Sequence, residues 1–256
     1  MENIFLPSKI ELSKGETPNE GVLTIEPLFH GYATTLGNAL RRVLLSSLPG
    51  AAVTSFKIKG VQHEFQAVEG IYEDVLEICL NLKQLRLKVY SDEPVVLELT
   101  KKGEGEVTAK DIKQNSDVEI INSDLKILTI TDKKFNLDME ITVQKGRGYD
   151  PTENRDKEQL SVGTIAIDAV YTPMVDVGLK VENTRVGQIT NFDKLVMNLE
   201  TDGTITPEQA VNYSAKILID HFSLLYKENI KIDEQKPEAE VEETKKAKKA
   251  TKKSKK

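Results

Sequence analysis

The sequence has few of the residues that build covalent or metal-bound frameworks. Among its 256 residues there is one cysteine, Cys79, which excludes a disulfide framework and a thiolate zinc site. The three histidines, His30, His63 and His221, are far apart, and the "HEFQA" segment that begins at His63 lacks the second histidine of a zinc-protease helix. We therefore expect this chain to hold no metal.

Long apolar runs are also missing. No run approaches the roughly 18 apolar residues that a bilayer crossing needs. The first residues, "MENIFLPSKIELSKGE", have neither the basic start nor the hydrophobic core of a secretion signal. We expect a cytoplasmic protein with no membrane partner.

A hydrophobic content of 39% is enough for one large domain or two modest ones.

Basic charge without acid is confined to one end of the sequence. Residues 245–256, "KKAKKATKKSKK", hold eight lysines and no acidic residue. Because the whole chain carries −6 and these lysines contribute +8, residues 1–244 carry −14. Nucleic acid binding needs Lys and Arg clustered on the fold itself, so an acidic body argues against a main surface of that kind.

Residues 231–256 have the composition of a disordered tail. Beyond Ile232 there is no aromatic residue and one isolated valine, which is too little apolar surface to order the segment. Two roles stay open for this Lys-rich tail. It is either a solvated solubility tail or a sequence-nonspecific, salt-sensitive contact to DNA.

Hydropathy patterns predict many short strands and a few helices. Apolar and polar residues alternate in "SKIELS", "GVLTIEPL" and "VTSFKIKGV", then from "LRLKVYS" to "MEITVQ" and from "TIAIDAVYTPM" to "KLVMNLETDG". Apolar residues three and four apart predict a helix at 67–82. Gly, Pro and unpatterned charge predict a long loop at 145–163. The mixture indicates an α+β fold.

The segment "GYATTLGNALRRVLLSSLPG", residues 31–50, predicts an opening helix that Pro49 and Gly50 end. Apolar residues cover well over half of its circumference. The remaining arc holds Asn38, Arg41, Arg42 and Leu45. Guanidinium groups make planar, directional hydrogen bonds, so this patch suits docking onto carboxylates and carbonyls of a partner. The alternative is that the arginines form an ordinary solvated face.

The last helix, expected at about 207–228, is also apolar over a wide arc. It starts at "TPEQ", where Thr206 and Gln209 fit a capping box. Two sets of apolar residues recur every seven positions: Ala210, Ile217 and Leu224, and Val211, Leu218 and Leu225. Such breadth implies two contacts, one within its own domain and one with another helix or subunit. The alternative is a helix sunk in one large core.

The string "GYATTLGNALRRVLLSSLPGAAV" resembles the N-terminal signature of the bacterial RNA polymerase α subunits. The resemblance continues in chain order through "GVQHEF", "EGIYEDVLEICLNLK", "VTAKDI", "VQKGRGY" and "VENTRVGQITNFDKLVMNLETDGTITPEQA". It covers about residues 20–228, and a series of long motifs is far more specific than a short pattern. The small DNA-binding helical domain that usually follows in the family is not expected here.

The resemblance implies two interleaved subdomains. Residues 1–48 and 170–230 would form a dimerisation subdomain, and residues 49–169 a mostly β subdomain inserted into it. In the family the opening and last helices form the homodimer interface, which agrees with their excess of apolar surface. The residues expected there are Leu36, Leu40, Val43, Leu44, Val211, Ile217, Leu218, Phe222 and Leu225.

The resemblance also implies contacts with the large polymerase subunits. Arg42 and Leu45 match positions that bind the β subunit, and Asn38 and Arg41 lie in the same patch. On the other copy of the dimer, Lys83 and Ile167 match positions that contact the β′ subunit.

The function implied is a non-catalytic assembly platform. The homodimer would recruit β and β′, with ω and a σ factor completing the RNA polymerase. No residue constellation here supports catalysis; nucleotide addition needs carboxylates that hold two metal ions, and the family places the Mg²⁺ site on β′. The alternatives are a DNA-binding transcription regulator that uses the basic tail and, less favoured, a standalone enzyme.

Overall fold

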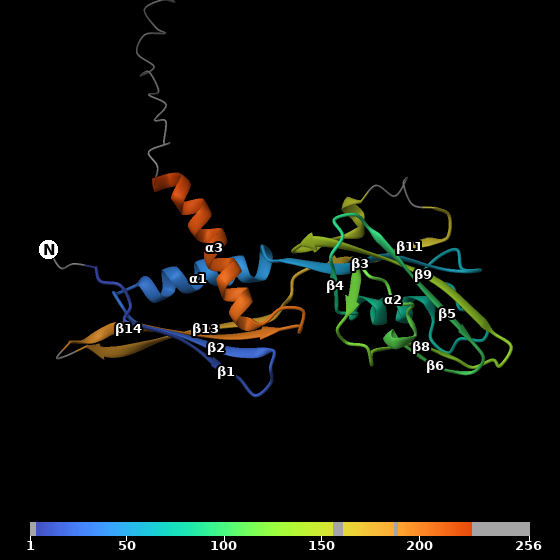
Figure 1. Cartoon of the computed structure of the whole chain (residues 1–256), viewed down its shortest axis with the longest axis horizontal. Coiled ribbons are helices and arrows are strands. Elements are labelled where there is room, and N and C mark those ends of the chain that lie inside the picture. The colour runs from blue at the N-terminus through green and yellow to red at the C-terminus, as the bar shows by residue number, and fades with distance from the viewer. Residues whose placement is uncertain (1–3, 156–160, 187–188, 227–256) are drawn as a thin grey trace, which may run out of the picture. The chain divides into compact units, whose positions relative to one another are not determined.

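The computed structural model describes residues 4–155, 161–186 and 189–226 (Figure 1). The described residues divide into two units after Leu218, and Ile219–Tyr226 are the described part of the second unit. The expected Lys-rich tail, residues 231–256, lies outside the described residues. The mixture of helices and strands confirms the α+β class.

The first sheet contains the strands from the two ends of the chain. These are β1 (Lys9–Lys14), β2 (Glu20–Leu28), β13 (Met174–Val186) and β14 (Ile189–Thr201). Their order is β1-β2-β14-β13, and neighbouring strands are antiparallel. Alternate residues turn to one face and are buried there, among them Leu23, Ile25, Val177, Leu195, Met197 and Leu199.

Helix α1 (Tyr32–Ser46) lies across the face of this sheet and packs on β13 and β14 (Figure 1). Its buried residues are Ala33, Gly37, Leu40 and Leu44, whose spacing places them on one side of a helix. Gly37 allows the close approach, because a Cβ there would lie 2.5 Å from Leu179 Cδ1 and 2.9 Å from Leu195 Cδ1.

The end of α1 differs from the sequence prediction. The helix stops at Ser46, where Ser47 N donates to Val43 O, and Pro49 and Gly50 already belong to β3 (Pro49–Ile58). Gly50 pairs with Gly146 in the sheet, and a Cβ at Gly50 would lie 1.8 Å from Tyr171 O. This glycine therefore makes room for Tyr171, and it is not a helix cap.

The second sheet has the order β11-β3-β9-β5 and is antiparallel throughout. Besides β3 it contains β5 (Val95–Lys102), β9 (Asn136–Arg147) and β11 (Thr164–Ala166). Three strand pairs accompany it: β4 (Leu87–Val89) with β7 (Val118–Ile120), β6 (Gly105–Thr108) with β8 (Lys126–Ile130), and β10 (Tyr149–Asp150) with β12 (Ala169–Val170). Phe56, Ile58 and Val61 enter its core.

The two sheets have separate hydrophobic cores. One core draws its buried residues from 23–48 and 174–210, and the other from 53–167. The division of the chain into two subdomains stays a prediction.

The expected helix at 67–82 is shorter than predicted. Helix α2 spans Val75–Lys83, and Asp74 caps it by accepting a hydrogen bond from Glu77 N at 2.7 Å. Gly70 has a φ of +90° and Ile71 makes a β-bridge to Ile130, so this part of the chain is not helical. The apolar spacing of Ile71 fits a helix, but its side chain enters the core from an extended segment.

Glu73, which lies just before α2, is a buried acidic residue. Its side chain is 2% exposed and pairs with Lys126 Nζ at 2.9 Å. Glu73 also accepts hydrogen bonds from Thr129 N at 2.5 Å and Thr129 Oγ1 at 3.0 Å. The buried carboxylate therefore ties the start of α2 to β8.

The expected loop at 145–163 is partly ordered. Its first residues end β9, β10 follows, and a short 3₁₀ helix occupies Thr152–Asn154. Residues 156–160 lie outside the described part of the chain.

Helix α3 (Pro207–Tyr226) begins as predicted. Gln209 N donates to Thr206 Oγ1 and Thr206 N donates to Gln209 Oε1, both at 3.2 Å, which completes the capping box. Residues 227–228 of the expected helix lie outside the described residues. Of the helices that the structure describes, none is long and apolar enough to cross a membrane.

The close packing of α1 leads to a stability prediction. Gly37→Val should lower the free energy of unfolding by about 1–3 kcal/mol, because the added atoms overlap Leu179 and Leu195. Helix propensity alone would not cause a loss, since Val is no worse than Gly in a helix. Thermal unfolding measures the effect, and Thr34→Val on the exposed face of α1 is the control. Equal melting temperatures for Gly37→Val and the original protein would contradict this packing.

The Glu73 tie predicts a pH dependence. Burial by itself raises the pKa of a carboxyl, but hydrogen bonds from Lys126 and Thr129 outweigh it and lower the pKa of Glu73. Because the pKa of Glu73 is lower in the folded than in the unfolded chain, its ionised form stabilises the fold at pH values above the unfolded-state pKa of about 4.3. This stabilisation is lost as the pH falls through the folded-state pKa. Glu73→Gln should therefore cost about 1–3 kcal/mol near pH 7. The cost should shrink under acid conditions.

Denaturant titrations across pH 3–7 would check this prediction, with the exposed Glu69→Gln as the control. A cost that does not depend on pH would show that the charge of Glu73 contributes nothing.

Candidate functional site

The structure brings Asn38, Arg41, Arg42 and Leu45 together on the outer face of α1. All four are exposed, and their spacing of three, four and seven residues places them on one side of the helix. We call these four residues the arginine patch. The opposite side of the helix holds the buried residues that contact the sheet. The direction of the patch is therefore set by the packing of α1.

A buried carboxylate holds the start of this helix. Asp193 on β14 is 8% exposed, and its Oδ2 accepts hydrogen bonds from Gly31 N at 2.9 Å and Ala33 N at 3.4 Å. The helix has no acidic residue in its first turn, so Asp193 supplies the negative charge that favours a helix N-terminus. The residue before α1, Gly31, has a φ of +78°, which suits glycine.

The arginine patch carries positive charge that no described side chain neutralises. Within the described residues, the guanidinium groups of Arg41 and Arg42 make no hydrogen bond or ion pair. Leu45 adds a partly exposed apolar side chain beside them, at 37% exposure. Weakly hydrated guanidinium groups next to an apolar side chain favour contact with carboxylates and carbonyls.

The nine residues expected at the dimer interface fall into two groups. Leu40 and Leu44 are buried in the core of their own chain, and Val211, Ile217 and Leu218 pack partly against the same core. Leu36, Phe222 and Leu225 are exposed, at 38%, 60% and 60%, and Val43 is half-buried. The exposed group is available to a partner.

The last two turns of α3 present many apolar side chains to solvent. Ile219, Phe222, Leu224, Leu225 and Tyr226 are between 60% and 90% exposed. The first half of α3 instead buries Pro207, Ala210 and Ser214. Within the described residues, α3 is thus not sunk in one core along its whole length.

The two residues expected to contact β′ lie near each other. Lys83 is in the last turn of α2, and its Nζ lies 3.5 Å from Asp168 Oδ2. Asp168 follows Ile167, which is 2% exposed and belongs to the core of the second sheet. The side chain that reaches the surface beside Lys83 is therefore that of Asp168.

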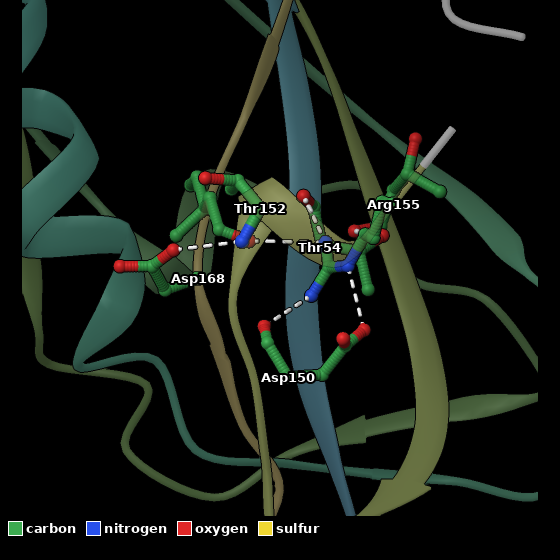
Figure 2. A network of polar contacts seen from close by, with 7 residues as sticks. Thr54, Asp150, Thr152, Arg155 and Asp168 are labelled. Carbon is green, nitrogen blue, oxygen red and sulfur yellow. Dashed lines mark hydrogen bonds and ion pairs between the residues drawn. The ribbon is translucent and has the colours of Figure 1, made fainter. Parts of the chain in front are cut away.

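The Asp168 carboxylate is fixed from two sides. Thr152 N donates to Asp168 Oδ1 at 3.0 Å (Figure 2). This hydrogen bond, together with the positive charge of Lys83, lowers the pKa of Asp168. Partial desolvation and the Asp168 carboxylate raise the pKa of the neighbouring phenol of Tyr149, which is 59% exposed. We call Lys83, Asp168 and Tyr149 the lysine–aspartate surface.

Behind this surface, Arg155 makes a network of hydrogen bonds that Figure 2 shows in part. Its Nε donates to Asp150 Oδ2 at 2.7 Å and its Nη2 to Asp150 O at 2.9 Å. Its Nη1 donates to Thr54 O and to Ile167 O, both at 3.0 Å. The guanidinium thus joins β3, β10 and the segment after β11.

Sequence reasoning did not identify this network. Arg155 lies in a segment rich in charge and without periodicity, and Thr54 is 101 residues away from it. The one local signal is Asp150, five residues before Arg155 across a Pro-containing turn. Such a signal is common in solvated loops.

In the described residues, no three or more His, Cys, Asp or Glu side chains form a group that could hold a metal ion. Asp193 and Asp168 make hydrogen bonds that join separate segments of the fold.

Comparisons with known proteins agree with the resemblance in the sequence. Residues 56–172 match the family described as RNA polymerase Rpb3/RpoA insert domain. The DNA-directed RNA polymerase subunit alpha of Macrococcus caseolyticus is 52% identical over 215 residues, which are 84% of this chain and 68% of that protein. The subunit alpha of Oceanobacillus iheyensis is 51% identical over the same shares. The chain belongs to the DNA-directed RNA polymerase subunit alpha family.

Proposed function

We propose that this chain is a non-catalytic platform for assembly of RNA polymerase. It dimerises and recruits the β and β′ subunits. Together with ω, these subunits form the core enzyme that transcribes DNA into RNA. A σ factor then joins the core enzyme. The observation that carries this proposal is the arginine patch, two unneutralised guanidinium groups on a helix anchored to a sheet.

The arginine patch is proposed as the contact with β. Arg is enriched among the residues that dominate binding energy at interfaces, because it combines apolar stem and planar donors. Arg42 and Leu45 match the β-binding positions of the family, and Asn38 and Arg41 extend the same face. A partner segment with carboxylates or free carbonyls would complement this face.

The exposed apolar end of α3 is proposed as part of the homodimer interface, with Leu36 on α1. Burying a large apolar side chain stabilises by about 1.5–3 kcal/mol. Five such side chains between Ile219 and Tyr226 therefore favour association over exposure. A second copy of the chain offers the same apolar surface, which suits a two-fold interface.

The lysine–aspartate surface is proposed as the contact with β′, on the copy that does not bind β. Ile167 would act from the core beneath this surface, because its side chain is buried. We expect the Mg²⁺ ions of nucleotide addition to be held by β′ and not by this chain. The chain itself would need no cofactor.

The proposed location is the cytoplasm, at the DNA that the enzyme transcribes. DNA would be met through the large subunits, and at most weakly by the Lys-rich tail of residues 231–256, outside the described residues. A transcription regulator that binds DNA through this tail is the less favoured alternative, because residues 1–244 carry −14.

The β contact is tested by Arg42→Ala. Because Arg42 is exposed and its guanidinium makes no hydrogen bond or ion pair with a described residue, the variant should fold and dimerise normally. Its affinity for the β subunit should fall by about 30-fold, or about 2 kcal/mol. Co-purification of tagged variants with β and β′, together with template-dependent RNA synthesis, measures this loss.

Lys102→Ala is the matched control, since it removes an exposed cation from the second sheet. The proposal fails if Arg42→Ala recruits β as well as the control does. An unfolded Arg42→Ala would contradict the separation between surface and core.

The dimer interface is tested by Phe222→Asp. This change places an unpaired carboxylate in the proposed interface, and desolvating that charge is costly. Since Phe222 is 60% exposed in the single chain, the fold itself should survive. Sedimentation should show monomers at concentrations where the unmodified chain is dimeric. Asn212→Asp adds the same charge at an exposed polar position of α3, and should leave the dimer mass unchanged.

A further inference from the structure

The network around Arg155 starts from an irregularity in β3. The pairing of β3 with β9 shifts register between Val53 and Ser55, so Thr54 is an extra residue in the strand. Such a bulge re-aims the groups of the extra residue. Thr54 O accepts hydrogen bonds from Ile167 N at 2.9 Å and from Arg155 Nη1 at 3.0 Å. One carbonyl thus receives two donors from the segment 155–167.

Arg155 completes this arrangement by satisfying three carbonyl oxygens and one carboxylate. Its acceptors are Thr54 O, Ile167 O, Asp150 O and Asp150 Oδ2. Its side chain is 21% exposed, and no buried side-chain polar atom in the described residues lacks a partner. A planar guanidinium reaches acceptors in several directions at once, whereas a lysine ammonium acts as a point charge. The site is therefore built for arginine.

Arg155 is connected to the partly exposed residue Asp168 through the peptide unit that precedes Asp168. Arg155 and Thr54 hold the carbonyl and the amide of Ile167, and the next residue is Asp168. Arg155 also binds Asp150, two residues before Thr152, whose N–H donates to Asp168 Oδ1. Both the backbone before Asp168 and the donor to its carboxylate thus depend on the same guanidinium.

We infer that Arg155 is the positioning residue of the lysine–aspartate surface. It sets the Asp168 carboxylate at 3.5 Å from Lys83 without itself contacting the partner. The inference rests on the proposed function, because it concerns recruitment of β′ through that surface. It adds to that function a residue that neither helix periodicity nor the family resemblance singled out.

The test uses purified full-length chain, isolated β and β′, and two variants, Arg155→Met and Arg155→Lys. Arg155→Met removes all the guanidinium donors. A preformed complex of this variant with β should bind β′ with about tenfold lower affinity than the unmodified complex does. Arg155→Lys keeps the charge but loses the planar fork, so we expect an intermediate loss. Uptake of β should not change, since the arginine patch is untouched. Arg147→Met, an exposed arginine of β9, is the matched control.

A second measurement separates positioning from general stability. Amide hydrogen exchange at Thr152 and Ile167 should speed up in Arg155→Met, while exchange in α1 should not. Combined with Lys83→Ala, Arg155→Met should weaken β′ uptake little beyond either change alone, because both act on one surface. Should Arg155→Met fail to fold, Arg155→Lys carries the same comparisons.

The outcomes distinguish this inference from the proposed function. Normal β′ uptake by both Arg155 variants, while Lys83→Ala is impaired, overturns the inference alone. Losses that add fully with Lys83→Ala, or an equal loss of β uptake, would show a purely structural role and also overturn it. An unmodified chain that recruits neither β nor β′ refutes the proposed function and the inference together.

Discussion

The close packing of Gly37 against Leu179 and Leu195 determines how α1 is oriented on the first sheet. Because no side chain separates helix from sheet at this point, α1 lies close to β13 and β14 and cannot rotate without breaking that contact. Asp193 then fixes the start of the helix through Gly31 and Ala33. A helix held on one side has a defined opposite side, and the arginine patch occupies it.

The second sheet depends on polar ties where the first depends on close apolar contact. Its irregular positions, the bulge at Thr54 and the non-helical segment before α2, each leave backbone groups that the strands do not pair. Arg155 joins the groups at the bulge, and Glu73 joins the second segment to β8. Charged side chains with several donors or acceptors suit this task, because buried backbone groups are costly when unpaired.

Local patterns in the sequence predicted features of single helices, whereas contacts between distant residues were not predictable from them. The arginine patch follows from helix periodicity alone, which is local, and the capping box at Thr206 is local as well. The start of α2 was mispredicted because Ile71 fits helical spacing while its neighbours Glu73 and Asp74 form contacts that only the folded sheet supplies. The Arg155 network joins residues up to 101 positions apart, so no local pattern announces it.

Two identical chains must present different faces to two different large subunits if the proposed function holds. Within the described part of the chain the arginine patch offers cations without an ion-pair partner, so it favours a partner that brings carboxylates or carbonyls. The lysine–aspartate surface is already paired at 3.5 Å, so it favours a partner that can bind a cation and an anion side by side. Exchanging the partners would leave charges desolvated and unpaired, which is costly. Under the proposed function, each chain therefore carries both surfaces, and each large subunit binds the surface whose charges complement its own.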